Sequence, residues 1–193
     1  MLPIILASSS PFRRELLNKL GLPFTCHSPD IDETAKAGES PEALVERLAL
    51  EKAHAVARKN SKSLIIASDQ VAVLNGQIMT KPHTHTKAVE QLTLSSGNSV
   101  HFLTSLCLFN SQTQNAQIII APYAVEFLSL TQEQIEAYLK KEQPYQCAGS
   151  FKSEGLGISL FSKMEGEDPN SLIGLPLIQL TQMLRNEGVE PLS

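Results

Sequence analysis

A single carboxylate interrupts an apolar segment near the middle of the chain. Residues 64–67 form a continuous apolar run rich in β-branched residues, which is typical of a strand covered on both faces. The apolar pattern resumes at Val71, and Ser68, Asp69 and Gln70 lie between the two runs. An unpaired buried carboxylate costs several kcal/mol, so a strand keeps one only where another group pairs with it. Asp69 is therefore either a structural residue that caps a neighbouring loop, or a metal ligand or general base at a strand end.

Two further segments carry groups that suit phosphate chemistry. Residues 8–14, Ser-Ser-Ser-Pro-Phe-Arg-Arg, follow a short apolar strand and open a helix with Ser10 as its N-cap and Pro11 at the first helical position. Hydroxyl groups, an arginine and the positive end of a helix dipole at one place form a phosphate cradle. An ordinary helix cap with two solvated arginines is the alternative. Adjacent helical residues point about 100° apart, so at most one of Arg13 and Arg14 faces a site.

Asp30, Asp32 and Glu33 form an acidic loop after the second predicted strand. Three carboxylates within four residues suit a hard cation such as Mg²⁺ or Mn²⁺, although loops are also rich in solvated acids. Lys52 falls on the apolar inner face of a predicted helix, where a lysine either extends its ammonium to solvent or reaches a buried anion.

Three more candidates lie later in the chain. Lys81 precedes a proline just beyond a predicted hairpin, and Lys152 and Glu154 belong to a polar, glycine-flanked loop over residues 149–157. A loop of this composition is typical of a binding loop.

Composition limits the class of protein. Of the 193 residues, 42% are hydrophobic and 19% are charged, which indicates an ordinary globular chain that we interpret as one domain spanning residues 1–193. The net charge of −4 argues against a protein whose main role is to bind the nucleic-acid backbone, but it is compatible with binding of one small phosphorylated substrate. Cys26, Cys107 and Cys147 form no disulfide framework or zinc motif, and no signal peptide or membrane span is evident, so we expect a cytoplasmic protein without a membrane partner.

The order of elements predicts an α/β fold with a mixed, twisted sheet, because strands and helices alternate early and strands cluster in the middle. An Asn75-Gly76 hairpin is expected, and residues 166–170 are expected to form a turn. The predicted strands are 2–7, 23–26, 64–74, 77–79, 100–109, 118–120, 123–128 and 158–161, and the predicted helices are 11–20, 41–59, 86–95, 131–142 and 176–187.

Taken in order, these motifs resemble the Maf family of nucleotide pyrophosphatases over nearly the whole chain. The resemblance lies in residues 6–11 with Arg13 and 15–17, then 32–34, 51–53, 68–70, Gly76 with Lys81-Pro82, and 149–155. It implies a cytoplasmic enzyme that uses a divalent metal to cleave a nucleoside triphosphate to the monophosphate and pyrophosphate. It also implies an elongated, two-lobed α/β fold akin to that of inosine triphosphatases, with a central cleft.

By the same resemblance, Asp69 is the catalytic acidic residue that accepts the water proton. The chemistry agrees, because splitting a phosphoanhydride builds charge that a carboxylate-held metal and cationic donors stabilise. Glu33 and Asp69 are the predicted metal ligands. The predicted phosphate-binding residues are Ser8, Arg13, Lys52, Lys81 and Lys152.

Three positions point to one branch of that family. Most members carry an arginine where this chain has Phe12, whereas a branch that acts on 7-methyl-GTP carries a large aromatic residue there, usually Trp, together with Gln and Glu at the places of Gln70 and Glu154. A cationic methylated guanine stacks well on an aromatic ring. We therefore predict hydrolysis of 7-methyl-GTP to 7-methyl-GMP and pyrophosphate, with Phe12, Gln70 and Glu154 setting specificity.

Two alternatives remain open. One is a dTTP/UTP pyrophosphatase of the same family. The other is a non-catalytic nucleotide-sensing or nucleic-acid-binding regulator of cell division, which the acidic charge and the carboxylate set disfavour. The expected partner is a small-molecule nucleotide rather than nucleic acid, and the resemblance alone suggests a homodimer.

Overall fold

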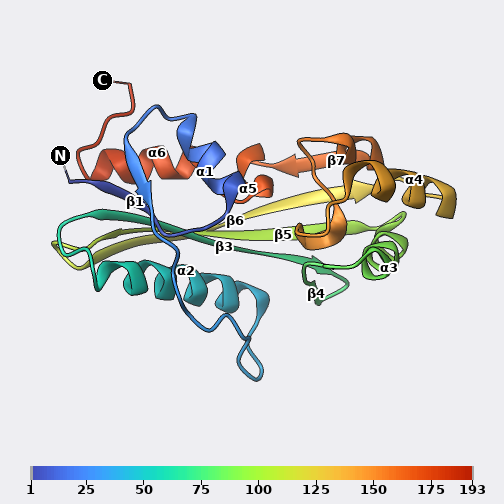
Figure 1. Cartoon of the computed structure of the whole chain (residues 1–193), viewed down its shortest axis with the longest axis horizontal. Coiled ribbons are helices and arrows are strands. Elements are labelled where there is room, and N and C mark those ends of the chain that lie inside the picture. The colour runs from blue at the N-terminus through green and yellow to red at the C-terminus, as the bar shows by residue number, and fades with distance from the viewer. Residues whose placement is uncertain (1, 193) are drawn as a thin grey trace. The chain divides into compact units, whose positions relative to one another are not determined.

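The computed structural model describes residues 2–192, whose strands form a seven-stranded mixed sheet (Figure 1). Its order is β2-β1-β3-β5-β6-β7, and β4 pairs with β3. β1 is parallel to β2 and β3, whereas the β3–β4 and β6–β7 pairs are antiparallel. The predicted α/β class with a mixed sheet is therefore confirmed. The strands are β1 (Ile4–Leu6), β2 (Phe24–Cys26), β3 (Leu64–Leu74), β4 (Gln77–Met79), β5 (Ser99–Asn110), β6 (Asn115–Phe127) and β7 (Phe161–Gly166).

The helices are α1 (Pro11–Asn18), α2 (Pro41–Ala57), α3 (His85–Ser95), α4 (Gln132–Glu142), α5 (Pro169–Ile173) and α6 (Leu177–Asn186). Two short 3₁₀ turns cover Ala148–Ser150 and Leu156–Leu160. Within residues 2–192, no helix combines the length and apolar character needed to cross a membrane.

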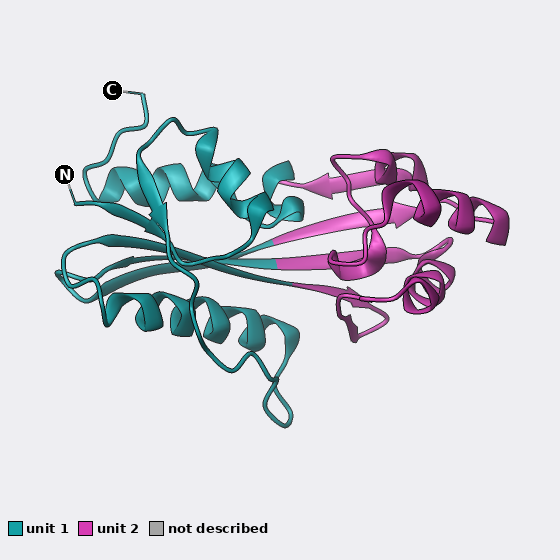
Figure 2. Cartoon of the chain, in the orientation of Figure 1, with its two compact units in different colours: residues 1–70, 104–121, 168–193 teal, residues 71–103, 122–167 magenta. Residues whose placement is uncertain are grey.

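Residue contacts divide the chain into two compact units (Figure 2). Unit 1 comprises residues 1–70, 104–121 and 168–193, and unit 2 comprises residues 71–103 and 122–167.

In unit 1, helices cover both faces of the sheet (Figure 1). Leu6 and Ile66 point to one face and pack in a cluster with leucines of α1 and α6. Ile5 and Ile65 point to the other face and pack against the alanines and Val56 of α2. Because both faces are covered, successive residues of β1 and of the first part of β3, residues 64–67, are all apolar.

In α1 and α2, the helix begins at a proline that follows a capping serine. The Ser10 hydroxyl accepts a hydrogen bond from the Arg13 N–H at 3.4 Å, and the Ser40 hydroxyl accepts one from the Ala43 N–H at 3.2 Å. Each cap satisfies a helix N–H that has no partner within the helix. The buried face of α2 matches the predicted face: Leu44, Val45, Leu48, Ala49, Lys52, Ala53 and Val56.

Unit 2 begins with the predicted hairpin and contains its own aromatic core. Asn75 and Gly76 have φ of 50° and 79°, the left-handed pair that a two-residue type I′ hairpin turn requires. Edge-to-face contacts join a phenylalanine cluster that comprises Phe102, Phe127, Phe151 and Phe161. A side chain at Gly157 would place its Cβ 2.2 Å from the Lys152 carbonyl oxygen, so only glycine fits there.

Three sequence-based predictions about the second half of the chain are wrong. Residues 158–160 do not form a strand, because they belong to the 3₁₀ turn Leu156–Leu160, in which Ile158 is exposed. The strand in this region, β7, begins only at Phe161. Residues 166–170 are not simply a turn, because α5 begins at Pro169 behind the cap Asp168. The two strands predicted on either side of Pro122 are one continuous strand, β6. Proline has no N–H to donate, but β7 pairs with β6 only from Tyr123 onward, so no hydrogen bond between β6 and β7 is lost at Pro122.

Candidate active site

Lys52 joins two carboxylates in unit 1. Its Nζ donates to Asp69 Oδ1 at 2.6 Å and lies 3.0 Å from Glu33 Oε1. Lys52 and Asp69 are only 5% and 7% exposed, whereas the Glu33 side chain is 57% exposed. Lys52, on the inner face of α2, is therefore the partner that the buried Asp69 on β3 requires. Glu33 adds a second carboxylate on the solvent-exposed side of Lys52.

The remainder of the acidic loop has other roles. Asp32 Oδ1 accepts a hydrogen bond from the Thr34 N–H at 2.9 Å. The Thr34 side chain and then this backbone bond lower the pKa of Asp32. Asp30 is exposed. Of the three loop carboxylates, Glu33 is the one that forms an ion pair with Lys52.

Arg13, on the first turn of α1, lies within the electrostatic influence of the same carboxylates. Burial lowers the pKa of Arg13, while the charges of Asp69 and Glu33 oppose that shift. Its Nε donates to the Gly174 carbonyl oxygen at 2.9 Å. Partial burial of the guanidinium is tolerated here because a carbonyl and two carboxylates compensate its charge.

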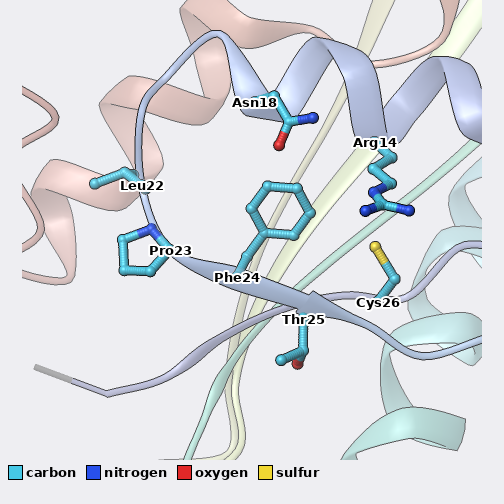
Figure 3. A pocket seen from close by; sticks show the side chains of 7 residues that line it. All are labelled: Arg14, Asn18, Leu22, Pro23, Phe24, Thr25 and Cys26. Carbon is cyan, nitrogen blue, oxygen red and sulfur yellow. The ribbon is translucent and has the colours of Figure 1, made fainter.

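Arg14 points to a different surface. It lines an open hollow of about 500 Å³ between α1 and β2, together with Asn18, Phe24 and Cys26 (Figure 3). None of the predicted site residues lines this hollow. Arg13 and Arg14 therefore lie on different surfaces of α1, as their adjacent positions on a helix predict.

Ser8 lies at the same end of the sheet as Asp69. Leu6 pairs with Ile66 in the parallel β1–β3 ladder, so Ser8 follows β1 where Ser68 and Asp69 follow Ile66 on β3. The Ser8 hydroxyl accepts a hydrogen bond from the Ser10 N–H at 3.1 Å and stabilises the turn into α1. Unit 1 thus brings five predicted site residues to one region: Ser8, Arg13, Glu33, Lys52 and Asp69.

Phe12 and Gln70 belong to unit 1 as well. Phe12 is partly exposed on the first turn of α1. Gln70 Nε2 lies 2.8 Å from Thr104 Oγ1 and 2.9 and 3.0 Å from the carbonyl oxygens of Ser171 and Leu172. The amide nitrogen of Gln70 therefore ties β3 to β5 and α5, a structural role that the sequence did not predict.

The other three predicted residues lie in unit 2. Lys81 is exposed after β4, and Glu154 is exposed in the loop that follows the first 3₁₀ turn. Lys152 Nζ lies 3.3 Å from Glu142 Oε1, and its backbone N–H donates to the Tyr138 hydroxyl at 3.1 Å. Helix α4 therefore anchors the loop that carries Lys152 and Glu154.

The carboxylates of unit 1 fit a divalent cation. Asp69 and Glu33 converge on one cationic atom, and both offer the oxygen ligands that Mg²⁺ and Mn²⁺ prefer. Among residues 2–192, no three His, Cys, Asp or Glu side chains gather as a metal cage. Mg²⁺ commonly takes only one or two protein carboxylates and completes its shell with water and substrate phosphates, so the pair is compatible with such a site.

Comparison with known proteins decides the family. The model of the Maf family, described as Maf-like protein, matches residues 3–187. This chain belongs to the Maf family. The resemblance seen in the ordered sequence motifs is therefore confirmed.

Relatives of this Maf chain match it over almost its whole length. It is 60% identical over 186 residues to the 7-methyl-GTP pyrophosphatase of Pseudomonas savastanoi pv. phaseolicola, covering 96% of this chain and 97% of the relative. It is 53% identical over 193 residues to the protein of the same name from Colwellia psychrerythraea, covering 100% of this chain and 96% of the relative.

A solved structure supports the fold of the Maf chain. The Staphylococcus aureus Ham1 protein superposes with a TM-score of 0.55 and 14% identity, covering 96% of this chain and 99% of that chain. At this identity the likeness concerns the fold alone, and it agrees with the predicted α/β fold class.

Sequence reasoning missed residues that hold the Maf site residues in place. The Gly174 carbonyl contacts Arg13, and the Ser105 hydroxyl accepts the Asp69 N–H at 3.1 Å while donating to the Val45 carbonyl oxygen at 2.6 Å. Ser105 thereby links the strand of Asp69 to the helix of Lys52. The sequence offered one signal for the Gly174 segment: Asp168-Pro169 repeats the cap-and-proline pattern that opens α1 and α2.

Proposed function

We propose that this Maf-family chain hydrolyses 7-methyl-GTP to 7-methyl-GMP and pyrophosphate. The observation that carries the proposal is its identity of 53–60%, over nearly its full length, to relatives named 7-methyl-GTP pyrophosphatase. The paired carboxylates and cations of unit 1 support it, because this set suits attack of water on a phosphoanhydride.

In the proposed mechanism, Asp69 is the general base. Lys52 donates a hydrogen bond to Oδ1, and Oδ2 receives the proton of the attacking water. Arg13 and Lys52 bind the phosphate oxygens on which negative charge builds, and the Ser8 hydroxyl adds a donor. These groups lower the barrier by stabilising charge rather than by forming a covalent intermediate.

The proposal includes a divalent metal held by Glu33 and Asp69. When bound, it would neutralise negative charge on the phosphate oxygens, which is the usual contribution of Mg²⁺ to phosphoryl chemistry. Both carboxylates lie within 3.0 Å of the same atom, Lys52 Nζ, so they are close enough to each other for both to bind one ion.

Lys81 and Lys152 are proposed to contribute further phosphate contacts, and Phe12, Gln70 and Glu154 to select the base. Phe12 presents an aromatic face to the cationic methylated ring, and Glu154 accepts hydrogen bonds from guanine N1–H and its amino group. Because the Gln70 amide nitrogen is bonded to Thr104 and α5, its carbonyl oxygen is the group proposed to contact the nucleotide. We further propose that the enzyme is cytoplasmic, dimerises, and acts on free nucleotides rather than nucleic acid.

A nucleotide panel tests this function. Purified protein is incubated with 7-methyl-GTP, GTP, UTP and dTTP, and both pyrophosphate and the nucleoside monophosphate are quantified. We expect the highest kcat/KM for 7-methyl-GTP. A preference for UTP or dTTP would contradict the proposed substrate, and the absence of any turnover, together with nucleotide binding, would favour a non-catalytic sensor.

A further inference from the structure

The carbonyl oxygen of Gly174 is a junction between the arginine and the strand that carries Asp69. It accepts a hydrogen bond from Arg13 Nε at 2.9 Å and another from the Ser68 hydroxyl at 2.9 Å. Ser68 is fully buried and immediately precedes Asp69 on β3. One backbone oxygen at the end of α5 therefore connects α1 to β3 within unit 1.

A bond at Nε has a particular consequence for an arginine. The guanidinium is planar and carries five N–H donors in a fixed arrangement. Once Nε–H is bonded, the plane of the group and the direction of its terminal nitrogens are set. Arg13 lies in the field of Asp69 and Glu33, so the Nε bond determines how its remaining donors lie relative to those carboxylates.

We propose that Gly174 is a positioning residue for Arg13. Its carbonyl, together with the Ser68 hydroxyl, holds the guanidinium in the orientation that receives a phosphate group. The phosphate part of this inference rests on the proposed function, whereas the orienting hydrogen bond does not depend on it.

The backbone around Gly174 is fixed at both ends of a short segment. At one end, the N–H groups of Gly174 and Leu175 both donate to the Asn170 carbonyl oxygen, at 3.0 and 3.1 Å. At the other end, buried Asp168 accepts the Asn170 N–H at 2.8 Å and the Ile178 N–H at 2.7 Å, one on each carboxylate oxygen. These bonds cap the starts of both α5 and α6, so the carbonyl between the two helices has a defined direction.

Only glycine suits the backbone at this position. Gly174 has φ of +127°, which residues with a side chain rarely adopt. A Cβ added there would lie 3.5 Å from Arg13 Nε, which is ordinary van der Waals contact. Gly174→Ala should therefore act by turning the backbone carbonyl rather than by pushing the arginine away.

The matched control is Gly188→Ala. Gly188 also has a positive φ, of +75°, and a Cβ there meets no atom within 4 Å. Both substitutions strain the backbone near the ends of neighbouring helices, but only Gly174 contacts Arg13. Each glycine substitution is made in two backgrounds, one with wild-type Arg13 and one with Arg13→Lys. The lysine retains a positive charge but lacks the Nε–H.

A double-mutant cycle then measures positioning. With Arg13 present, we expect Gly174→Ala to lower kcat/KM for 7-methyl-GTP about tenfold, as for loss of one charge-assisted hydrogen bond. With Arg13→Lys, the same substitution should cost less than about twofold, and Gly188→Ala should cost less than about twofold in both backgrounds. Equal losses from Gly174→Ala in both backgrounds would overturn the proposal.

Two additions keep the test decisive. If Gly174→Ala does not fold, Ser68→Ala takes its place, with an expected loss of about threefold that vanishes in Arg13→Lys. Independently of turnover, ¹⁵N NMR should show a slowly exchanging Arg13 Nε–H in wild type and Gly188→Ala but not in Gly174→Ala. If wild type cleaves no nucleotide, the proposed function fails while this signal still tests the positioning; an unchanged signal in Gly174→Ala would contradict it.

Discussion

The ammonium of Lys52 lies 2.6 Å from Oδ1 of Asp69, in a region where both side chains are almost completely buried. Lysine and aspartate therefore compensate each other's charge in the absence of substrate. An isolated charge in this environment would be unfavourable, so removal of either partner affects the other. We expect the loss of Asp69 and the loss of Lys52 to have different effects on kcat and on the free energy of unfolding, and both quantities can be measured.

Asp69→Asn is expected to lower kcat by about 10²–10⁴-fold, because the variant lacks the proposed general base. The amide retains the shape of the side chain and an oxygen that can accept from Lys52. Circular dichroism and thermal unfolding would verify that the fold is retained. Turnover within about threefold of wild type would remove Asp69 from the mechanism.

Lys52→Met should lower both activity and stability, because it leaves Asp69 buried without its cationic partner. We expect the free energy of unfolding to fall by about 3 kcal/mol. Adding Asp69→Asn to Lys52→Met should restore part of the stability but none of the activity. Lys81→Met is the matched control, since Lys81 is exposed and its loss should weaken catalysis with little change in urea unfolding. Equal destabilisation by both lysine variants would contradict this account.

Removal of divalent metal should abolish turnover. Glu33 and Asp69 offer oxygen ligands to a hard cation, so excess EDTA should stop pyrophosphate release and added Mg²⁺ or Mn²⁺ should restore it. Glu33→Gln should raise the metal concentration needed for half-maximal rate. Full activity in EDTA-treated, metal-free buffer would show that the reaction needs no such ion.

The double variant Phe12→Arg with Glu154→Gln should reduce kcat/KM for 7-methyl-GTP more than for UTP. An arginine at position 12 repels the cationic methylated base, and the amide at position 154 no longer offsets its charge. Aromatic stacking on a cation contributes about 0.5–2 kcal/mol, so a change of about twofold to thirtyfold in relative preference is expected. An unaltered preference would show that other residues select the base.

The three thiols should differ in reactivity with iodoacetamide. Burial raises the pKa of Cys107 to about 12 and that of Cys147 to about 11, whereas Cys26 is exposed. The thiolate is the reactive form, so a raised pKa leaves about 10⁻³ of Cys147 ionised near pH 8, and its labelling rate should rise about tenfold per pH unit below its pKa. Mass spectrometry should find Cys26 labelled first. Rapid labelling of Cys107 in folded protein would contradict its burial.

Local sequence signals predicted the elements that local interactions determine. Ser10 and Ser40 cap helices where their position before a proline indicates, and the apolar spacing of α2 identified Lys52 on its buried face. The pattern on β3 likewise singled out Asp69. That these two side chains meet depends on how α2 packs on the sheet, which neither pattern contains.

The errors arise where contacts that the apolar pattern does not contain determine the structure. Leu156 and Ile158 alternate as in a strand, yet Gly157 packs directly on the Lys152 backbone and the segment turns instead. The bond between Arg13 and Gly174 joins residues 161 positions apart, so no periodicity in the sequence signals it. The same is true of the Gln70 contacts with α5, which give a predicted specificity residue a structural role.

The carboxylate of Asp168 also determines which changes in chain length the protein tolerates. Because its two oxygens accept backbone N–H groups from Asn170 and Ile178, the chain between those residues must return to the same side chain. A substitution on the exposed face of this segment leaves both hydrogen bonds to Asp168 intact. Inserting or deleting one residue would instead leave a buried carboxylate oxygen of Asp168 without its N–H donor. The length of the segment is thus constrained more tightly than its composition, even though it lies next to the C-terminal helix and far in sequence from Asp69.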